Sequence, residues 1–290
     1  MTKTSKAYAK INLSLDVIEK MQDGYHYLIS VMQSVGLNDE ITVKCLKSSE
    51  KNERGKISIV TGVPYLPGDE RNIAAKAALS FFEHTGITGY DIDIVIQKKI
   101  PVCAGLGGGS TDAACVLRML NDIFETGLAR QALETLGNTL GSDIPFCIEG
   151  GTKLAKGRGE ILTDLPSMPH SYIVICKPPF SCSTPELFKR IDCGKIHARP
   201  DTDGLVKSLE AGDLLALARH MYNVFEDILP QGKREIEEIK STLLDNSALG
   251  CVMTGTGPSV FGIFNDHVNA QNAYKQLITG YTDCFLTETI

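Results

Sequence analysis

A run of glycines between a strand pattern and a helix pattern constrains the fold of this chain more than any other feature. The run reads Gly105-Leu106-Gly107-Gly108-Gly109 and is followed by Ser110-Thr111. Residues 90–96 alternate as a strand does, and apolar residues recur at helical spacing over about residues 111–124. Glycines let backbone amides approach an anion closely, and a helix N-terminus adds unpaired N–H donors. The segment therefore predicts a site for a di- or triphosphate.

Two common phosphate loops do not fit this run. A P-loop needs Gly-Lys-Ser/Thr, whereas Gly109 is followed directly by Ser110. The dinucleotide fingerprint needs a third glycine where Ser110 stands. The alternative is a flexible surface turn with Ser110 as the N-cap of the helix. We prefer the phosphate interpretation, because a bare linker is unusual between an apolar strand and an apolar helix face.

The other patterns along the chain mix strands and helices without a regular βαβ series. This mixture predicts two α+β sandwiches, with a boundary near Gly150-Gly151. Charged or polar stretches at 47–54 and 192–203 are expected to be loops. Strands are expected at residues 7–17, 41–46, 56–61, 172–176, 251–253, 260–264 and 284–287, and helices at 72–84, 130–140, 205–225, 234–244 and 268–277.

Composition excludes some classes of partner and location. The net charge of -6 implies no broad basic surface, so we expect no nucleic acid and no membrane partner. No apolar run approaches the roughly 20 residues that span a bilayer, and residues 1–10 are polar, so we expect a cytoplasmic protein. The nine cysteines lack metal-ligand spacing. Five of them lie in apolar segments and are expected to be small core residues: Cys103, Cys115, Cys147, Cys176 and Cys251.

Three segments in order give the chain a family resemblance that spans nearly its whole length. They are Lys10-Ile11-Asn12-Leu13, residues 101–114 with the glycine run, and residues 253–261 (Met-Thr-Gly-Thr-Gly-Pro-Ser-Val-Phe). The ordered set resembles the GHMP kinase superfamily. Within it the chain is most similar to kinases whose acceptor is a methyl-branched sugar alcohol linked to a cytidyl diphosphate. The segments that discriminate are Asp23-Gly24-Tyr25-His26, Gly141-Ser142-Asp143-Ile144-Pro145-Phe146, Ser183-Thr184-Pro185 and Asn223-Val224-Phe225-Glu226.

The resemblance implies an α+β, two-domain GHMP kinase fold. Its N-terminal, ATP-binding domain (residues 1–151) would be like domain 2 of ribosomal protein S5, and its substrate-side C-terminal domain (residues 152–290) would be ferredoxin-like. It further implies ATP as co-substrate with Mg²⁺, and small-molecule substrates only. The sequence shows no clear carboxylate ligand for the metal, which the hydroxyl of Ser110 or Thr111 could reach, and it carries no signal for an oligomeric state.

The resemblance places the catalytic base at Asp143, with Lys10 as its partner. Taken alone, Asp143 stands in a turn before Pro145, where an aspartate is usually a cap or solvated. Lys10 and Asn12 are two apart on an expected strand, so their side chains share one face, roughly 7 Å apart. An ammonium near a carboxylate stabilises its charged form and a developing alkoxide. The alternative for Lys10 is a solvated strand face.

Tyr25 and His26 are the candidates for recognising cytosine. An aromatic ring stacks on the flat face of a base, and an imidazole or its backbone bonds the polar edge. The alternative is a half-buried turn pair after Gly24. Thr184 is expected to hold the erythritol or diphosphate end of the acceptor, and Asn12 the end that carries the hydroxyl.

The ATP side is expected to combine the glycine run with five residues outside it. Lys98 and Asn72 are placed near the adenine or its ribose; the alternatives are a surface pair with Lys99 and a helix cap, respectively. Residues 255–259 are expected to cover the active site, with a plain hairpin turn as the alternative. The full ATP set is Asn72, Lys98, Pro101, Gly105, Leu106, Gly107, Gly108, Gly109, Ser110 and Thr111.

Three other functions stay open at this point. Another GHMP kinase would act on mevalonate or homoserine, and the Tyr25-His26 pair argues against it. A non-catalytic nucleotide-binding protein on the same fold would be expected to lose Lys10 or Asp143, and both are present. A structural or protein-binding role leaves the glycine run unexplained.

Overall fold

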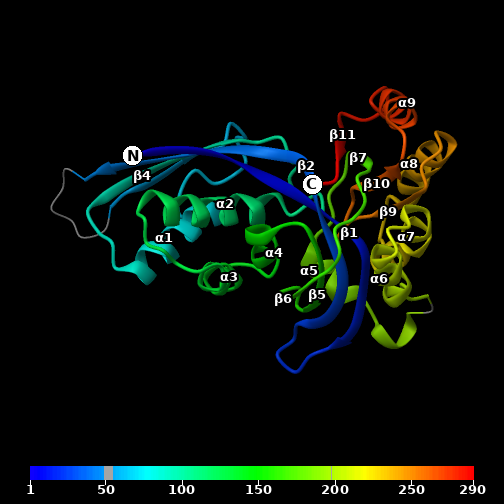
Figure 1. Ribbon diagram of the computed structural model, residues 1–290, viewed down its shortest axis with the longest axis horizontal. Coiled ribbons are helices and arrows are strands. Elements are labelled where there is room, and N and C mark those ends of the chain that lie inside the picture. Colours follow the sequence, from blue (N-terminus) through cyan, green and yellow to red (C-terminus); the bar gives the residue numbers. More distant parts are fainter. Residues whose placement is uncertain (49–54, 197) are drawn as a thin grey trace. The chain divides into compact units, whose positions relative to one another are not determined.

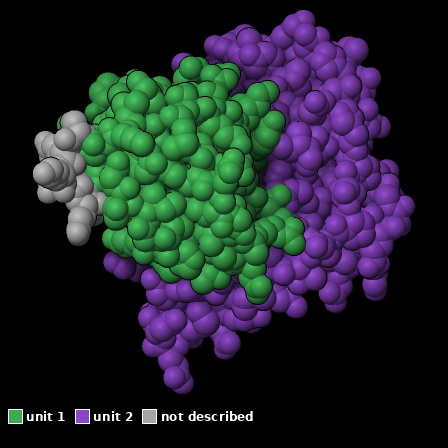
Figure 2. Space-filling model, turned by 60° about the vertical axis from the view of Figure 1, so that its left-hand side comes forward, with its two compact units in different colours: residues 1–9, 38–100, 107–149 green, residues 10–37, 101–106, 150–290 purple. Residues whose placement is uncertain are grey.

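The computed structural model describes residues 1–48, 55–196 and 198–290, which form two compact units (Figures 1 and 2). Unit 1 comprises residues 1–9, 38–100 and 107–149, and unit 2 comprises residues 10–37, 101–106 and 150–290. Residues 49–54 of the expected charged loop and residue 197 of the expected polar loop lie outside the described part. Because both units are discontinuous in sequence, the division into family domains at residues 1–151 and 152–290 stays a prediction.

Unit 1 is a sheet with helices on one face. The first two strands of the chain, β1 (Thr2–Lys20) and β2 (His26–Lys47), contribute residues to both units. In unit 1, β4 (Tyr90–Gln97) pairs antiparallel with β2 and parallel with β3 (Ile57–Val60). The helices are α1 (Ile73–Thr85), α2 (Gly108–Ile123), α3 (Arg130–Asn138) and α4 (Ile144–Glu149). Helices α1 and α2 lie along one face of the strands (Figure 1), where inward-facing residues such as Ile41 and Ile94 are buried.

Unit 2 contains the remaining parts of β1 and β2 and a second, separate sheet. Here β5 (Thr152–Gly157) pairs with β2 and with β6 (Ile161–Asp164), and the two-residue β8 (Tyr222–Asn223) runs parallel to β1. The second sheet is antiparallel, in the order β11 (Asp283–Glu288), β7 (Tyr172–Lys177), β10 (Val260–Phe264), β9 (Gly250–Met253). The helices are α5 (Thr184–Arg190), α6 (Thr202–Glu210), α7 (Leu214–His220), α8 (Lys233–Asp245) and α9 (His267–Leu277), with 3-10 turns η1 (Cys193–Lys195) and η2 (Val224–Ile228).

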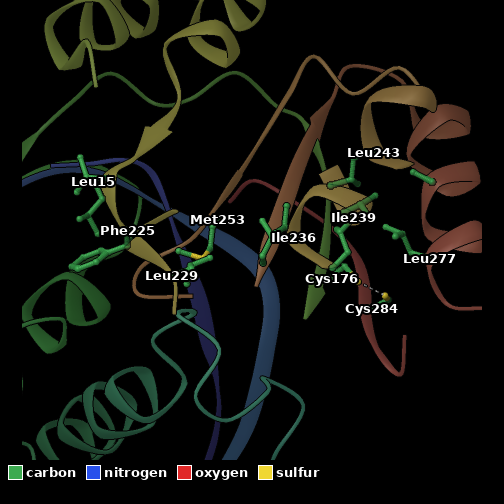
Figure 3. Close-up of a cluster of buried hydrophobic side chains, with 14 of the residues drawn as sticks. Leu15, Cys176, Phe225, Leu229, Ile236, Ile239, Leu243, Met253, Leu277 and Cys284 are labelled. Atoms are coloured by element: carbon green, nitrogen blue, oxygen red, sulfur yellow. Dashed lines mark hydrogen bonds between the residues drawn. The ribbon is translucent and has the colours of Figure 1, made fainter. Parts of the chain in front are cut away.

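A hydrophobic cluster joins the helices of unit 2 to its sheets (Figure 3). Leu15 of β1 and Phe225 of η2 belong to it, as do Ile239 and Leu243 of α8. Cys176 and Cys284 are register partners on β7 and β11, and their Sγ atoms lie 3.1 Å apart. The Cys284 thiol and burial raise the pKa of Cys176, so at neutral pH it is a protonated core side chain.

The expected core cysteines are only partly confirmed. Cys115, Cys147 and Cys176 are buried, but Cys251 is half-buried and Cys103 is exposed. Cys103 has a φ of 52°, which places it in a tight turn rather than an apolar strand. The apolar residues around it suggested burial, but the chain turns here as it leads into the glycines, and the side chain is exposed.

Two expected helix limits are wrong for local reasons. The single helix expected over residues 205–225 is α6 and α7, followed by β8 and the start of η2. The helix breaks because Gly212 adopts a φ of 64° after α6, and the Asp213 carboxylate caps α7 by accepting from the Ala216 amide. Helix α2 begins at Gly108 with Gly107 as N-cap, so Ser110 lies inside its first turn and is not the cap. The short α4, β5 and β6 were not expected, since four to six residues show too little periodicity to detect.

Within the described part of the chain, no helix is both long and apolar enough to cross a membrane.

Candidate active site

The glycine run forms a turn that delivers the chain into α2. Gly105 and Gly107 have φ values of 76° and 69°, the left-handed region that favours glycine. The Gly107 carbonyl accepts from the Thr111 amide at 2.8 Å, which starts the helix. The Thr111 hydroxyl donates to the Tyr8 carbonyl at 2.7 Å and ties this first turn to β1. The first amides of a helix have no acceptor within it, so they are available to an anion.

Gly105 packs directly against the turn that joins β9 to β10. A Cβ atom on Gly105 would lie 2.1 Å from the Thr254 carbonyl oxygen, and one on Gly255 would lie 2.9 Å from the Gly105 oxygen. Two backbones therefore touch here with no room for a side chain on Gly105.

Replacing Gly105 with Ala is expected to destabilise the protein more than the same change at Gly151. Both residues have a φ of 76°, but a Cβ on Gly151 meets nothing within 4 Å, so only Gly105 adds a backbone clash. Overpacking of this kind costs about 1–3 kcal/mol. Urea unfolding of the two variants measures the difference, and equal stabilities would contradict the close contact.

Lys10 and Asn12 form a buried polar network, as their predicted shared face requires. The Lys10 ammonium donates to Asn12 Oδ1 at 2.7 Å, and the Asn12 amide group donates to Ser30 Oγ at 2.8 Å. The Thr254 hydroxyl accepts from the Asn12 backbone amide at 3.0 Å and lies 3.2 Å from the Gly105 carbonyl. The side chain of Ile11, which lies between them, faces the core. The solvated alternative for Lys10 is wrong, since the residue is only 4% exposed.

Side chains from two other segments, Asn223 and Thr184, hydrogen-bond to the turn at residues 254–259 or to its first flanking residue. The Asn223 side chain donates to the Met253 and Gly255 carbonyls at 2.7 and 2.8 Å. The Thr184 hydroxyl, at the start of α5, lies 2.7 Å from the Thr256 hydroxyl. The turn is thus more than a plain hairpin connection, and its expected role over the active site stays a prediction.

Asp143 lies immediately before α4 in unit 1. The helix packs tightly on α3, because a Cβ on Gly137 would lie 2.5 Å from Ile144 Cγ2. Arg118 of α2 donates to the Cys147 and Ile148 carbonyls at 2.8 and 2.9 Å and so fixes the other end of α4. These contacts hold the backbone at Asp143 in place.

Tyr25 and His26 differ in exposure. Gly24, with a φ of 88°, turns the chain so that Tyr25 is 56% exposed, and the Arg158 guanidinium lies 4.8 Å from its ring centre. His26 is 9% exposed and lies 5.2 Å from the Phe188 ring. Burial, with a smaller contribution from Lys20, lowers the pKa of His26, so the ring is neutral at pH 7 and offers one donor and one acceptor.

The two expected adenine contacts have other partners in the structure. Asn72 is the N-cap of α1, since its side chain accepts from the Ala74 amide at 3.0 Å and donates to the Pro67 carbonyl. Lys98 is buried and ion-paired with Asp39 and Asp112, so the surface-pair alternative is wrong. Contacts of both residues with ATP stay predictions.

The predicted site residues divide between the two units. Lys10, Asn12 and Gly105 meet in one network through Thr254. Thr254, Asn223 and Asp112 lie in segments that carried the family resemblance, but the sequence indicated no role for them. Phe188 and Asp39 were not singled out at all, because their contacts join segments far apart in the chain. Unit 2 holds Lys10, Asn12, Tyr25, His26, Pro101, Gly105, Leu106 and Thr184, and unit 1 holds Asn72, Lys98, Gly107, Gly108, Gly109, Ser110, Thr111 and Asp143.

In residues 1–48, 55–196 and 198–290, Mg²⁺ has no ready-made protein cage. Among the described residues, no three His, Cys, Asp or Glu side chains gather as a metal-binding group. Mg²⁺ commonly keeps several waters and binds through substrate phosphates rather than a full set of side chains. Mg²⁺ that enters with a nucleotide would need no such group of side chains.

Comparison with known proteins identifies the family. The model of the GHMP kinase N-terminal domain matches residues 72–151, and that of the GHMP kinase C-terminal domain matches residues 205–283. The 4-diphosphocytidyl-2-C-methyl-D-erythritol kinases of Clostridium botulinum (strain Hall) and Clostridium kluyveri are each 42% identical over 286 residues, with at least 98% of this chain and 99% of each relative covered. A crystal structure of 4-(cytidine 5'-diphospho)-2C-methyl-D-erythritol kinase superposes with a TM-score of 0.82 at 27% identity, covering 99% of both chains. These matches confirm the predicted α+β GHMP kinase fold. The chain belongs to the GHMP kinase family, on the branch formed by the 4-diphosphocytidyl-2-C-methyl-D-erythritol kinases.

Proposed function

We propose that this protein transfers the γ-phosphate of ATP to the 2-hydroxyl of 4-diphosphocytidyl-2-C-methyl-D-erythritol. The product is the 2-phosphate, an intermediate of the non-mevalonate route to isoprenoid precursors. The 42% identity over 99% of the chain to kinases of this substrate carries the proposal. The cytoplasm stays the predicted location.

The glycine run is proposed to hold the ATP phosphates. Left-handed Gly105 and Gly107 bring the backbone to the start of α2, where first-turn amides and the helix dipole favour an anion. Mg²⁺ is proposed to enter with ATP and to offset the charge on its phosphates. Pro101 precedes the run, and the carbonyl of Leu106 within it accepts from the Lys10 amide at 3.1 Å.

Asp143 is proposed to accept the proton of the attacking hydroxyl, with Lys10 stabilising the negative charge that develops. Phosphoryl transfer depends mainly on positioning and electrostatics, together with a base that orients the attacking hydroxyl and accepts its proton. The Lys10 ammonium is fixed by Asn12, which is itself fixed by Ser30. Pre-organised groups lose little conformational freedom when substrate binds, which favours the transition state.

The acceptor is proposed to bind through Tyr25, His26, Thr184 and Asn12. The exposed Tyr25 ring offers a stacking face, and the neutral His26 ring can offer either its donor or its acceptor nitrogen to the polar edge of cytosine. Thr184 supplies a hydroxyl for the diphosphate or erythritol end.

Changing Gly107 to Val is expected to weaken ATP binding about tenfold or more. A β-branched residue at a φ of 69° costs roughly 1–2 kcal/mol and moves the amides that face the phosphates. Gly127→Val is the matched control, since Gly127 has a φ of 66° and open space around it and lies outside the site. Titration calorimetry measures both affinities. An equal loss in the two variants would mean that strain alone, and not the phosphate loop, is responsible.

A direct assay decides between the proposal and its rivals. The pure protein is incubated with ATP, Mg²⁺ and either the cytidyl substrate, mevalonate or homoserine, and ADP is measured. ADP formation with the cytidyl substrate alone supports the proposal. Turnover of mevalonate or homoserine instead would identify the protein as another type of GHMP kinase. ATP binding without turnover of any acceptor would indicate a non-catalytic nucleotide-binding protein.

A further inference from the structure

A buried group of three charges lies beside the start of α2. The Lys98 Nζ atom is 2.5 Å from Asp39 Oδ2 and 2.8 Å from Asp112 Oδ2. The side chains of Lys98, Asp39 and Asp112 are only 7%, 0% and 6% exposed. We call these three residues the charge triad. Burial of charges is unfavourable unless they are paired, so a fully buried triad is an unusual feature that calls for a reason.

The charge triad connects the two ends of the chain segment that contains the glycine run. Asp39 Oδ1 accepts from the Lys99 and Ile100 amides at 2.5 and 2.9 Å, just after β4. Asp112 belongs to α2, five residues after its N-cap. Lys98 bridges them, and a Cβ on Gly108 would lie 3.0 Å from its Nζ atom, so the ammonium packs against the first residue of the helix.

The charges within the triad do not balance. One ammonium faces two carboxylates, and the second oxygen of Asp112, Oδ1, is buried with no hydrogen-bond partner. A buried carboxylate in this position takes up a proton more readily than an exposed one. Burial raises the pKa of Asp112 to about 8, although the Lys98 ammonium opposes the shift and Asp39 adds to it. Burial opposes the charge on Lys98 too, but the two carboxylates outweigh it and raise the pKa of Lys98.

The charged groups that act on Asp112 come from two directions. Asp39 faces it from β2 and Lys98 from the end of β4, and the Cys115 thiol on the same helix is in turn affected by Asp112. A phosphate at the start of α2 adds negative charge on the side of Gly108, against which the triad packs. This charge disfavours ionised Asp112 further, so a bound phosphate and a proton on Asp112 stabilise each other.

We propose that the charge triad is a proton-coupled positioning device for the phosphate loop, in which Asp112 carries a proton whenever nucleotide phosphate is bound. Lys98 and Asp39 fix the two ends of the loop, and protonated Asp112 removes the excess negative charge. This inference rests on the proposed use of the glycine run to hold ATP phosphates. It assigns Asp112 a positioning role, since it acts through Lys98 and α2.

The sign of the pH dependence follows from linkage. Below about pH 8 Asp112 already holds its proton, so nucleotide affinity does not change with pH on this account. Above that pH, binding must take up a proton, and affinity falls by at most tenfold per pH unit. A purely structural ion-pair group would give no such coupling.

The test is ADP binding by titration calorimetry between about pH 7.5 and about pH 9.5, where the ADP phosphates are fully ionised and no turnover occurs. Running each titration in two buffers of different ionisation enthalpy counts the protons taken up. The unmodified protein is expected to lose about 25-fold in affinity across this range and to take up close to one proton at its upper end. Asp112→Asn is expected to bind ADP with no pH dependence and no proton uptake.

Asp122→Asn is the matched control. Asp122 lies on the same helix, but its side chain is 55% exposed and pairs with Lys3, so this variant should keep the wild-type pH profile. Pronounced pH dependence that survives in Asp112→Asn would overturn the inference. So would tight ADP binding by the unmodified protein without proton uptake, and that result would leave the proposed function intact. Absence of ADP binding at every pH would overturn both. Proton uptake by the unmodified protein decides the inference even where the variant does not fold.

Discussion

Asp143→Asn is expected to lower kcat by about 10²–10⁴-fold while leaving ATP affinity close to the wild-type value. Asparagine keeps the size and shape of the side chain but cannot accept the proton of the attacking hydroxyl. The backbone of this segment is fixed by the close packing of Gly137 on Ile144 and by Arg118 on the far end of α4, so the variant should fold. Steady-state ADP formation gives kcat, and calorimetry gives ATP affinity.

The two measurements separate chemistry from folding. A loss of kcat with intact ATP binding supports a base at Asp143. A parallel loss of both would indicate a damaged fold, which thermal unfolding would reveal. Near-normal turnover would show that Asp143 is not the base and would leave proton transfer to another group.

Tyr25→Ala is expected to reduce kcat/KM for the cytidyl substrate by about ten- to a hundredfold. Stacking of a base on an aromatic ring contributes about 1–3 kcal/mol, and ATP affinity should not change because Tyr25 is assigned to the acceptor. Tyr25→Phe keeps the ring and should stay close to wild type. Tyr65→Ala removes an even more exposed tyrosine, 74% exposed and outside the predicted site, and serves as the control.

His26→Ala is expected to have a smaller effect on kcat/KM than Tyr25→Ala, because a contact through the His26 backbone would survive. The change would also remove the packing of His26 on Phe188, so thermal unfolding must accompany the kinetics. Equal losses of ATP and acceptor affinity in either variant would mean that the residue binds the adenine end of ATP or supports the fold. No change in both variants would remove the main residue-level argument for cytosine recognition.

Local patterns predicted those features that depend on neighbouring residues. The two-residue period of a strand placed Lys10 and Asn12 on one face, and their side chains are hydrogen-bonded. Helical spacing and the stop at Gly86 gave α1, which indeed ends with Gly86 in the left-handed region. Family resemblance, and not periodicity, supplied the assignments of Asp143 and Tyr25.

Features that depend on distant residues could not be predicted in this way. Lys98 was expected near the adenine or its ribose, with a surface pair with Lys99 as the alternative. Nothing local indicates that Asp39, 59 residues away, pairs with it. The Asn12 amide bonds to Thr254, 242 residues further along the chain, and no spacing rule reaches that far. The break at Gly212 was missed since the apolar spacing on either side of it still fitted one long helix.

The contacts of the Thr254 hydroxyl limit where this chain can be cut into fragments that keep the network around Lys10. It contacts the Asn12 backbone and the Gly105 carbonyl, so residues from both ends of the chain surround Lys10. A fragment that stops after residue 151 would keep Lys10, Asn12 and the glycine run but would lack this hydroxyl. Contacts of such long sequence separation form only after large loops have closed, which favours late assembly of this network during folding. Split or permuted versions of the chain should therefore recover activity only when the segment around Thr254 is returned to its place.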